Sequence, residues 1–157
     1  MKPVTILATC DIQPSVGDHL SSLAALDLVQ GAILVGGGCA AISGGRCRTV
    51  PSGPLTSQET LQAVMAHVET EHMIVVPAGR RISMEPWALE AMVRQARASG
   101  AGLVYSDFYE GTKEGQVLHP LNDCQAGSVR DDFDFGPVVL LSAPAVRAVL
   151  ARYGAVP

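Results

Sequence analysis

The sequence predicts an α/β domain in which a mostly parallel sheet carries helices on both faces. Short apolar, β-branched runs alternate along the chain with segments whose apolar residues recur at helical spacing. The composition, 48% hydrophobic and 17% charged residues over 157 positions, is that of one well-packed globular domain. Strands that are apolar along their whole length must be covered on both sides, which favours a parallel sheet between helical layers.

The first third of the chain opens with a strand and a helix. Residues 4–9 (VTILAT) form a β-branched apolar run, which predicts a buried strand. The segment from Ser15 to Asp18 has the spacing of a capping box, so a helix is expected to follow and to extend to about Val29. A second strand is predicted over residues 32–35. It runs into the three glycines Gly36 to Gly38, where a plain turn and a backbone that contacts a ligand are both open.

The middle of the chain repeats this alternation. A short basic strand is expected over residues 46–50, and the capping box from Thr56 to Glu59 predicts the next helix. Residues 73–77 (MIVVP) predict another buried strand, and Ser83 is expected to cap a helix that ends at Gly100. The buried faces of these two helices are predicted to carry Leu61, Val64, Met65 and Val68, and Leu89, Met92, Val93 and Ala96.

The last third contains a strand over residues 103–105, a hairpin over 108–119 and a strand over 138–141. Ser142 is expected to cap the final helix. Its predicted inner face is Val146, Val149, Leu150 and Tyr153.

The segment from Tyr105 to Gly136 stands out by its charge and its aromatic content. It holds seven of the fifteen acidic residues and five of the seven aromatic residues, against only Lys113 and Arg130 as cations. Its net charge is therefore −5, and the remainder of the chain is nearly neutral. Acidic and aromatic side chains in a Gly-, Asn- and Pro-containing segment are typical of a polar ligand site on loops. His119 is interpreted as a hydrogen-bonding residue of the hairpin rather than as a catalyst.

Composition also excludes several classes of partner. The net charge of −4 and the absence of a Lys/Arg cluster argue against nucleic acid, and no apolar run is long enough to span a membrane. Four cysteines without CxxC spacing favour reduced, mostly buried thiols in a cytoplasmic protein, with a metal site or a disulfide as the alternative. Whether a second copy of the chain covers the hairpin edge, as in a homo-oligomer, is left open.

In a parallel sheet, ligands bind beyond the carboxyl ends of the strands. The residues expected at that edge are Cys10 and Asp11, Gly36 to Gly38, Ala78 to Arg81, and Ser106 with Asp107.

The motifs at this edge resemble those of glycosyltransferase family 2. The likeness covers most of the chain, and its most specific parts are residues 102–109 (GLVYSDFY), His119-Pro120, and residues 125–136 (QAGSVRDDFDFG). It implies a Rossmann-like fold of the nucleotide-diphospho-sugar transferase type. It also implies that Thr9, Asp11, Gly37 and Gly38 contact the nucleobase and ribose of a nucleotide-sugar.

Two departures from the family bear on the chemistry. Family members end the second strand with Asp residues that hold the uracil or ribose, where this chain has Gly37 and Gly38. Family members place an Asp-x-Asp that binds Mg²⁺ or Mn²⁺ where this chain has residues 77–80 (PAGR), so no metal ligand is predicted there. Arg80 and Arg81 offer fixed positive charge for a diphosphate instead, which would make transfer metal-independent. The alternatives are that a divalent metal still binds elsewhere, or that this arginine pair is a solvated loop.

A carboxylate base is required to take the proton from an acceptor hydroxyl. Asp131, Asp132 and Asp134 are the catalytic candidates, and Asp107 is predicted to orient a sugar hydroxyl, or a metal ion if one binds. For any one of them the competing interpretation is structural, with Arg130 paired to a neighbouring Asp and with Asp132 and Asp134 capping turns.

The leading functional hypothesis is a single nucleotide-sugar-binding domain over residues 1–157, the donor half of a longer glycosyltransferase. A non-catalytic binding module derived from a transferase is the alternative, and whether the chain is an enzyme is left open. A nucleotidyltransferase is the third hypothesis. It is the weaker one, because the Gly-rich, Lys-containing loop of such enzymes is absent after the first strand.

Overall fold

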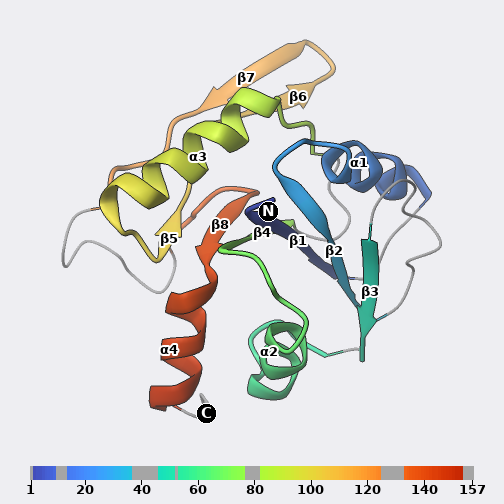
Figure 1. Ribbon diagram of the computed structural model, residues 1–157. Helices are drawn as coiled ribbons and strands as arrows, with labels where there is room; N and C mark the ends of the chain where they lie inside the picture. Colours follow the sequence, from blue (N-terminus) through green and yellow to red (C-terminus); the bar gives the residue numbers. More distant parts are fainter. Residues whose placement is uncertain are drawn as a thin grey trace.

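The computed structural model describes residues 2–9, 14–36, 46–51, 53–76, 82–124 and 133–153. Its centre is a six-stranded sheet in the order β3-β2-β1-β4-β8-β5 (Figure 1). The strands are β1 (Val4–Thr9), β2 (Val29–Val35), β3 (Arg46–Val50), β4 (His72–Val76), β5 (Leu103–Val104) and β8 (Val139–Ser142). β1, β2, β3 and β4 are mutually parallel, whereas β8 runs antiparallel to both of its neighbours. The predicted mostly parallel sheet is therefore confirmed.

Helices cover both faces of the sheet, as predicted. The helices α1 (Pro14–Ala24) and α3 (Pro86–Ser99) lie on one face, and α2 (Gln58–Met65) and α4 (Ala143–Tyr153) lie on the other (Figure 1). The side chains of β1 divide between the two cores, because successive residues of a strand point to opposite faces. Ile6 and Ala8 pack in the core under α1 and α3, and Leu7 packs in the core under α2 and α4.

Helix starts and ends differ from the sequence prediction at several points. α1 begins at Pro14, so Ser15 lies within the helix instead of capping it. α1 ends at Ala24 rather than near Val29, because Val29 is the first residue of β2, where it pairs with Val4 and is 2% exposed. The N-cap of α2 is Ser57, not Thr56: the Ser57 hydroxyl oxygen accepts a hydrogen bond from the Thr60 amide at 3.2 Å.

The start of α3 also differs from the prediction, because Ser83 is not the cap. The N-cap is Glu85, whose backbone is extended (φ −71°, ψ 144°), and Pro86 opens the helix. A residue that precedes proline is kept out of the helical region, so the helix cannot begin earlier. The predicted inner face of α3 is confirmed: Leu89, Met92, Val93 and Ala96 are all buried. Gly100 ends the helix with φ 67°, also as predicted.

The inner face predicted for α4 is only partly correct. Val146 and Leu150 pack against the core, but Val149 and Tyr153 are 50% and 59% exposed. The helix is held by Ser142, which accepts a hydrogen bond from the Ala145 amide, and by the Arg147 guanidinium, which donates to the Val68 carbonyl at 2.6 Å.

The cysteine prediction is corrected at two positions. Cys47 on β3 is disulfide-bonded rather than reduced, and Cys124 is a free thiol that is exposed rather than buried. Among the described residues, no helix is long and apolar enough to cross a membrane.

A separate two-stranded sheet completes the described structure. It is the predicted hairpin, formed by β6 (Phe108–Thr112) and β7 (Gly115–His119), and it projects above α3 in Figure 1. Its strands are joined by a two-residue turn, where the Thr112 hydroxyl accepts from the Glu114 amide and donates to the Gly115 carbonyl.

Candidate functional site

The reversed direction of β8 brings two distant acidic segments to the carboxyl edge of the sheet. β5 ends at Val104, which pairs with Leu140 of β8. Because β8 is antiparallel, the residues that precede it lie at the edge where β1, β2, β4 and β5 end. Residues 105–107 and residues 133–136 therefore meet there, although about 25 residues separate them along the chain.

An aromatic cluster joins these two segments. The ring of Tyr105 packs edge-on against Phe133 and Phe135, with centroids 5.7 and 5.4 Å away. The two phenylalanine rings lie 4.8 Å apart. Such edge-on pairs contribute roughly 0.5–1.5 kcal/mol each beyond area burial. The Phe-x-Phe spacing is the sequence signal for this cluster, since residues i and i+2 of an extended chain share one side. The aromatic content marked the segment as a candidate site, but the packing of these rings on Tyr105 was not predicted.

Three contacts close the base of the hairpin, and the first of them comes from Tyr105 of the cluster. The Tyr105 hydroxyl donates to the Asn122 carbonyl at 2.6 Å, and Asp107 Oδ1 accepts from the Leu121 amide at 2.7 Å. The rings of Phe108 and His119 stack with centroids 4.9 Å apart. The hairpin is thus positioned by residues at the edge of the sheet.

Gly136 packs into this base. Its φ of 76° lies in the left-handed region, and a Cβ there would lie 3.1 Å from Leu121 Cδ1 and 3.3 Å from Phe108 Cδ1. Glycine is therefore favoured at this position both by the backbone conformation and by the close approach of the hairpin base.

The two described aspartates of the predicted site, Asp107 and Asp134, are both exposed. Asp134 Oδ1 accepts a hydrogen bond from the Gly136 amide at 2.8 Å, so it has the turn-capping role that was the competing interpretation. Each carboxylate uses one oxygen in these local bonds. Asp107 and Asp134 come from segments that Tyr105 joins, and they place negative charge at one end of the sheet.

His119 has the structural role that the sequence analysis favoured. Its Nε2 lies 3.0 Å from Glu110 Oε2, which is an ion pair when the imidazole is protonated, and its ring stacks on Phe108. Nearby, burial raises the pKa of the Tyr105 phenol, and the charges of Cys124 and Asp123 raise it further. Tyr105 therefore stays a neutral hydrogen-bond donor at neutral pH.

The other half of the edge is formed by the ends of β1 and β2. Thr9 is the last residue of β1 and is half-buried. Gly36 follows β2 with φ 102°, a conformation that favours glycine, and its amide donates to the Val50 carbonyl at 2.9 Å. After β1 the chain adds β2 and β3 on one side of it, and then crosses to add β4 on the other side. The boundary between β1 and β4 is therefore the switch point at which such sheets bind ligands.

Most of the predicted site residues lie outside the described ranges. These are Asp11, Gly37, Gly38, Arg80, Arg81, Asp131 and Asp132. The predicted convergence of the glycine turn, the arginine pair and the aspartates therefore stays a prediction. Within the described residues, no three His, Cys, Asp or Glu side chains gather in a group suited to a metal ion.

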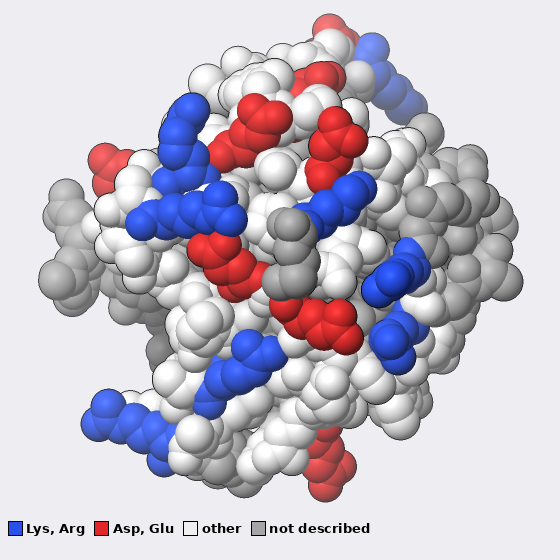
Figure 2. All heavy atoms as spheres, viewed as in Figure 1, with Lys and Arg blue, Asp and Glu red and all other residues white. Residues whose placement is uncertain are grey.

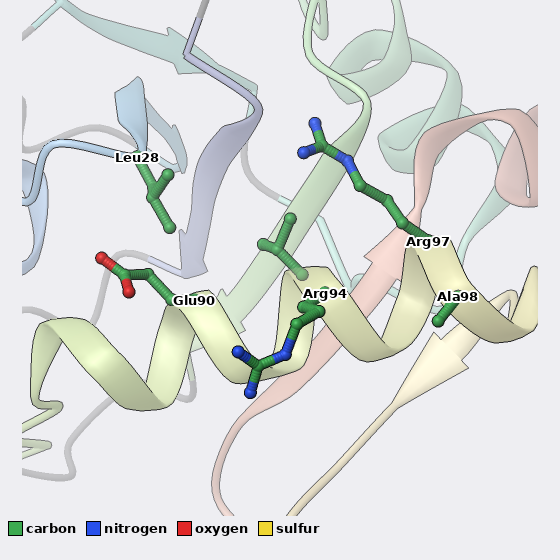
Figure 3. Close-up of a pocket in the computed structure, with 6 residues that line it drawn as sticks. Leu28, Glu90, Arg94, Arg97 and Ala98 are labelled. Carbon is green, nitrogen blue, oxygen red and sulfur yellow. The ribbon is translucent and has the colours of Figure 1, made fainter.

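A hollow of about 500 Å³ lies on the opposite edge of the sheet. It is lined by residues of α3 and by Leu28, which directly precedes β2 and so marks the amino edge. Figure 3 shows Leu28 opposite Glu90 and Arg94 across this hollow. Figure 2 shows acidic and basic side chains interspersed on the face in view, without a large patch of either sign. This hollow is separate from the carboxyl-edge site.

Comparison with solved structures identifies the fold. CMP:2-keto-3-deoxy-manno-octonic acid synthetase complexed with CTP superposes with a TM-score of 0.59 at 10% identity, over 95% of this chain and 78% of that one. HddC from Yersinia pseudotuberculosis gives 0.56 at 11% identity, over 94% and 80% of the two chains. The Francisella tularensis 2-C-methyl-D-erythritol 4-phosphate cytidylyltransferase gives 0.52 at 13% identity, over 95% and 78%. No protein-family model and no curated protein matches the sequence.

Identities this low establish the fold alone. The chain shares with these structures a Rossmann-like α/β fold, a mostly parallel sheet with helices on both faces, as the sequence predicted. The specific likeness to glycosyltransferase family 2 is not among these findings.

Proposed function

We propose that this chain is a transferase domain that binds a nucleotide-sugar across the carboxyl edge of its sheet. The observation that carries the proposal is the meeting of two acidic segments at that edge, joined by Tyr105 and its aromatic partners. One of the structures with a similar fold, the CMP:2-keto-3-deoxy-manno-octonic acid synthetase, is complexed with CTP, which supports a nucleotide as the ligand. The switch point between β1 and β4 supports this edge as the place where it binds.

Glycosyl transfer is the proposed reaction. It needs a carboxylate to accept the proton of the acceptor hydroxyl, and positive charge to stabilise the leaving diphosphate. In this proposal Asp131, Asp132 and Asp134 are the candidate bases, Asp107 orients a sugar hydroxyl, and Arg80 and Arg81 face the diphosphate. The chain would then be the donor-binding part of the transferase.

Asp107 is the described residue best suited to test this proposal. Its Oδ1 holds the Leu121 amide, and an asparagine keeps an oxygen that accepts the same bond. Asp107→Asn therefore removes one negative charge without opening the hairpin base. Asp27→Asn is the matched control, since Asp27 is exposed just before β2, at the amino edge.

Calorimetry with a panel of nucleotide-sugars, with and without Mn²⁺, is the direct test. We expect one donor to bind and the Asp107→Asn variant to bind it at least about tenfold more weakly, since a charged hydrogen bond contributes ~1.5–3 kcal/mol. The Asp27→Asn variant should bind like the unmodified chain. If no nucleotide or nucleotide-sugar binds under either condition, the proposal is wrong.

Nucleotidyl transfer is a second candidate, favoured by the solved structures named above, which include a CMP-sugar synthetase with CTP and a cytidylyltransferase. The products separate the two reactions. Release of pyrophosphate from CTP in the presence of a sugar or sugar phosphate would establish nucleotidyl transfer. Release of a nucleoside diphosphate from a nucleotide-sugar would establish glycosyl transfer. Binding without either product would identify a non-catalytic binding module.

A further inference from the structure

The β6–β7 hairpin is an unusually exposed part of this molecule. Every residue from Gly111 to Leu118 is exposed, and the hairpin projects away from the six-stranded sheet (Figure 1). In the described part of the chain, each of its strands pairs only with the other, so both outer edges are unpaired. A two-stranded sheet is at best marginally stable by itself in water.

Apolar side chains cover both faces of the hairpin. Tyr109 and Leu118 are directly paired across the strands and are therefore on the same face, 65% and 48% exposed. Val117 lies on the opposite face, where it pairs with Glu110, and is 48% exposed. An apolar cross-strand pair on a sheet with free edges is a feature that proteins usually cover.

The free edges of this protein differ in their protection against pairing with another strand. β3 carries Arg46 and Arg48 along its edge, and β5 is only two residues long; both features prevent strand addition. β6 has Glu110 at its midpoint. β7 has five residues, Gly115–His119 (GQVLH), with no proline and no Asp, Glu, Lys or Arg. Of these four strands, β7 is the one without such protection.

We infer that β7 pairs antiparallel with β7 of a second copy of this chain, which makes a four-stranded sheet across a two-fold axis at Val117. In this register the two Val117 side chains are direct neighbours, and each Leu118 faces a Gln116. Apolar and neutral residues then meet along the whole edge. The two Glu110 carboxylates end three strand spacings apart, about 14 Å, beyond the screening length at physiological salt.

The charge pattern selects this edge over β6. Antiparallel pairing of two β6 strands about their midpoint would place the two Glu110 carboxylates directly opposite each other, which is destabilising. A second copy also fits this edge better than an unrelated peptide, because a two-fold pair places Val117 against Val117 and brings no Asp, Glu, Lys or Arg of β7 against another.

Light scattering after size-exclusion chromatography, over a range of protein concentrations, tests the inference. We expect the mass to rise with concentration from 16.4 kDa towards twice this value. The critical variant is Val117→Lys: the lysine pairs with Glu110 across the hairpin and so preserves it, but faces the second lysine in the dimer. It should raise the dissociation constant at least about tenfold. Val149→Lys on α4, at a similarly exposed valine, is the control and should leave dimerisation unchanged.

A charge-swap variant tests the register itself. The double variant Glu110→Lys/Val117→Glu keeps an opposite-charge pair across the hairpin and should alone also impair dimerisation, because two glutamates then face each other. A mixture of this chain with the Val117→Lys chain should restore dimers, because lysine then faces glutamate. A chain that stays monomeric at all concentrations would overturn the inference. So would a dimer that Val117→Lys does not weaken, or a mixture that fails to pair. Hydrogen exchange of the β7 amides should slow in the dimer and return to the monomer rate in Val117→Lys.

Discussion

Gly136 offers the sharpest test of how the acidic segments are held together. Replacement by alanine has two costs: the left-handed backbone at φ 76°, and a Cβ at 3.1 and 3.3 Å from the ends of Leu121 and Phe108. The first term is about 1 kcal/mol for a non-glycine residue. The second is overpacking, and we expect a further ~1 kcal/mol because the contacted atoms are side-chain ends that can partly yield.

Gly100 provides a matched control for the backbone term. Its φ is 67°, but a Cβ there would meet no atom within 4 Å. Gly100→Ala should therefore cost only the backbone term, about 1 kcal/mol. For a chain of this size each kcal/mol lowers Tm by about 2–4 °C. The decrease in Tm caused by Gly136→Ala should therefore be roughly twice the decrease caused by Gly100→Ala.

Thermal and urea unfolding followed by circular dichroism measure both variants. The urea midpoint should fall further for Gly136→Ala than for Gly100→Ala, with an unchanged slope. Equal losses in the two variants would contradict the reasoning, because they would mean that Gly136 does not pack against the hairpin base. Addition of a bound nucleotide-sugar should then stabilise the Gly136→Ala variant less than the control if the site depends on this packing.

Two further predictions concern the polar groups at the amino edge. Burial lowers the pKa of His72, which is 3% exposed, below 6.5, and the Arg97 hydrogen bonds lower that of Glu71 below 4.5. Both groups therefore bind protons more readily in the unfolded chain, so the free energy of unfolding should fall as the pH drops below about 6.5. In a series of Tm measurements against pH, His72→Gln should reduce the part of this loss that begins near pH 6.5. A profile unchanged by His72→Gln would contradict this prediction. Thr5→Val removes a buried hydroxyl that lies 2.8 Å from the Thr70 hydroxyl, and should cost ~1 kcal/mol by urea unfolding, whereas no measurable loss would mean that this bond contributes nothing.

The strands and the hairpin could be predicted from the sequence because their signals are local. Runs such as Val4–Thr9 are apolar and β-branched over their whole length, which suits only a strand buried on both faces. The inner face of α3 followed from helical spacing alone, and Gly100 from the need for a left-handed residue at a helix end. Helices on both faces then followed, because two apolar surfaces must both be covered.

Helix boundaries depended on neighbours in space. The local pattern around Val29 is compatible with either a helix or a strand. Its pairing with Val4 makes it the first residue of β2. Val149 and Tyr153 continue the apolar spacing of α4, yet they lie exposed where the core ends.

The site shows the same division. The sequence alone marked residues 105–136 as acidic and aromatic, since composition needs no coordinates. The antiparallel course of β8, which brings Phe133 and Phe135 to Tyr105, was decided only by tertiary structure, because strand direction depends on which strands pair and not on the residues within one strand. Likewise, the sequence left open whether Asp134 caps a turn, and only the structure shows its bond from the Gly136 amide and the left-handed backbone at Gly136, a conformation that glycine permits but does not by itself require.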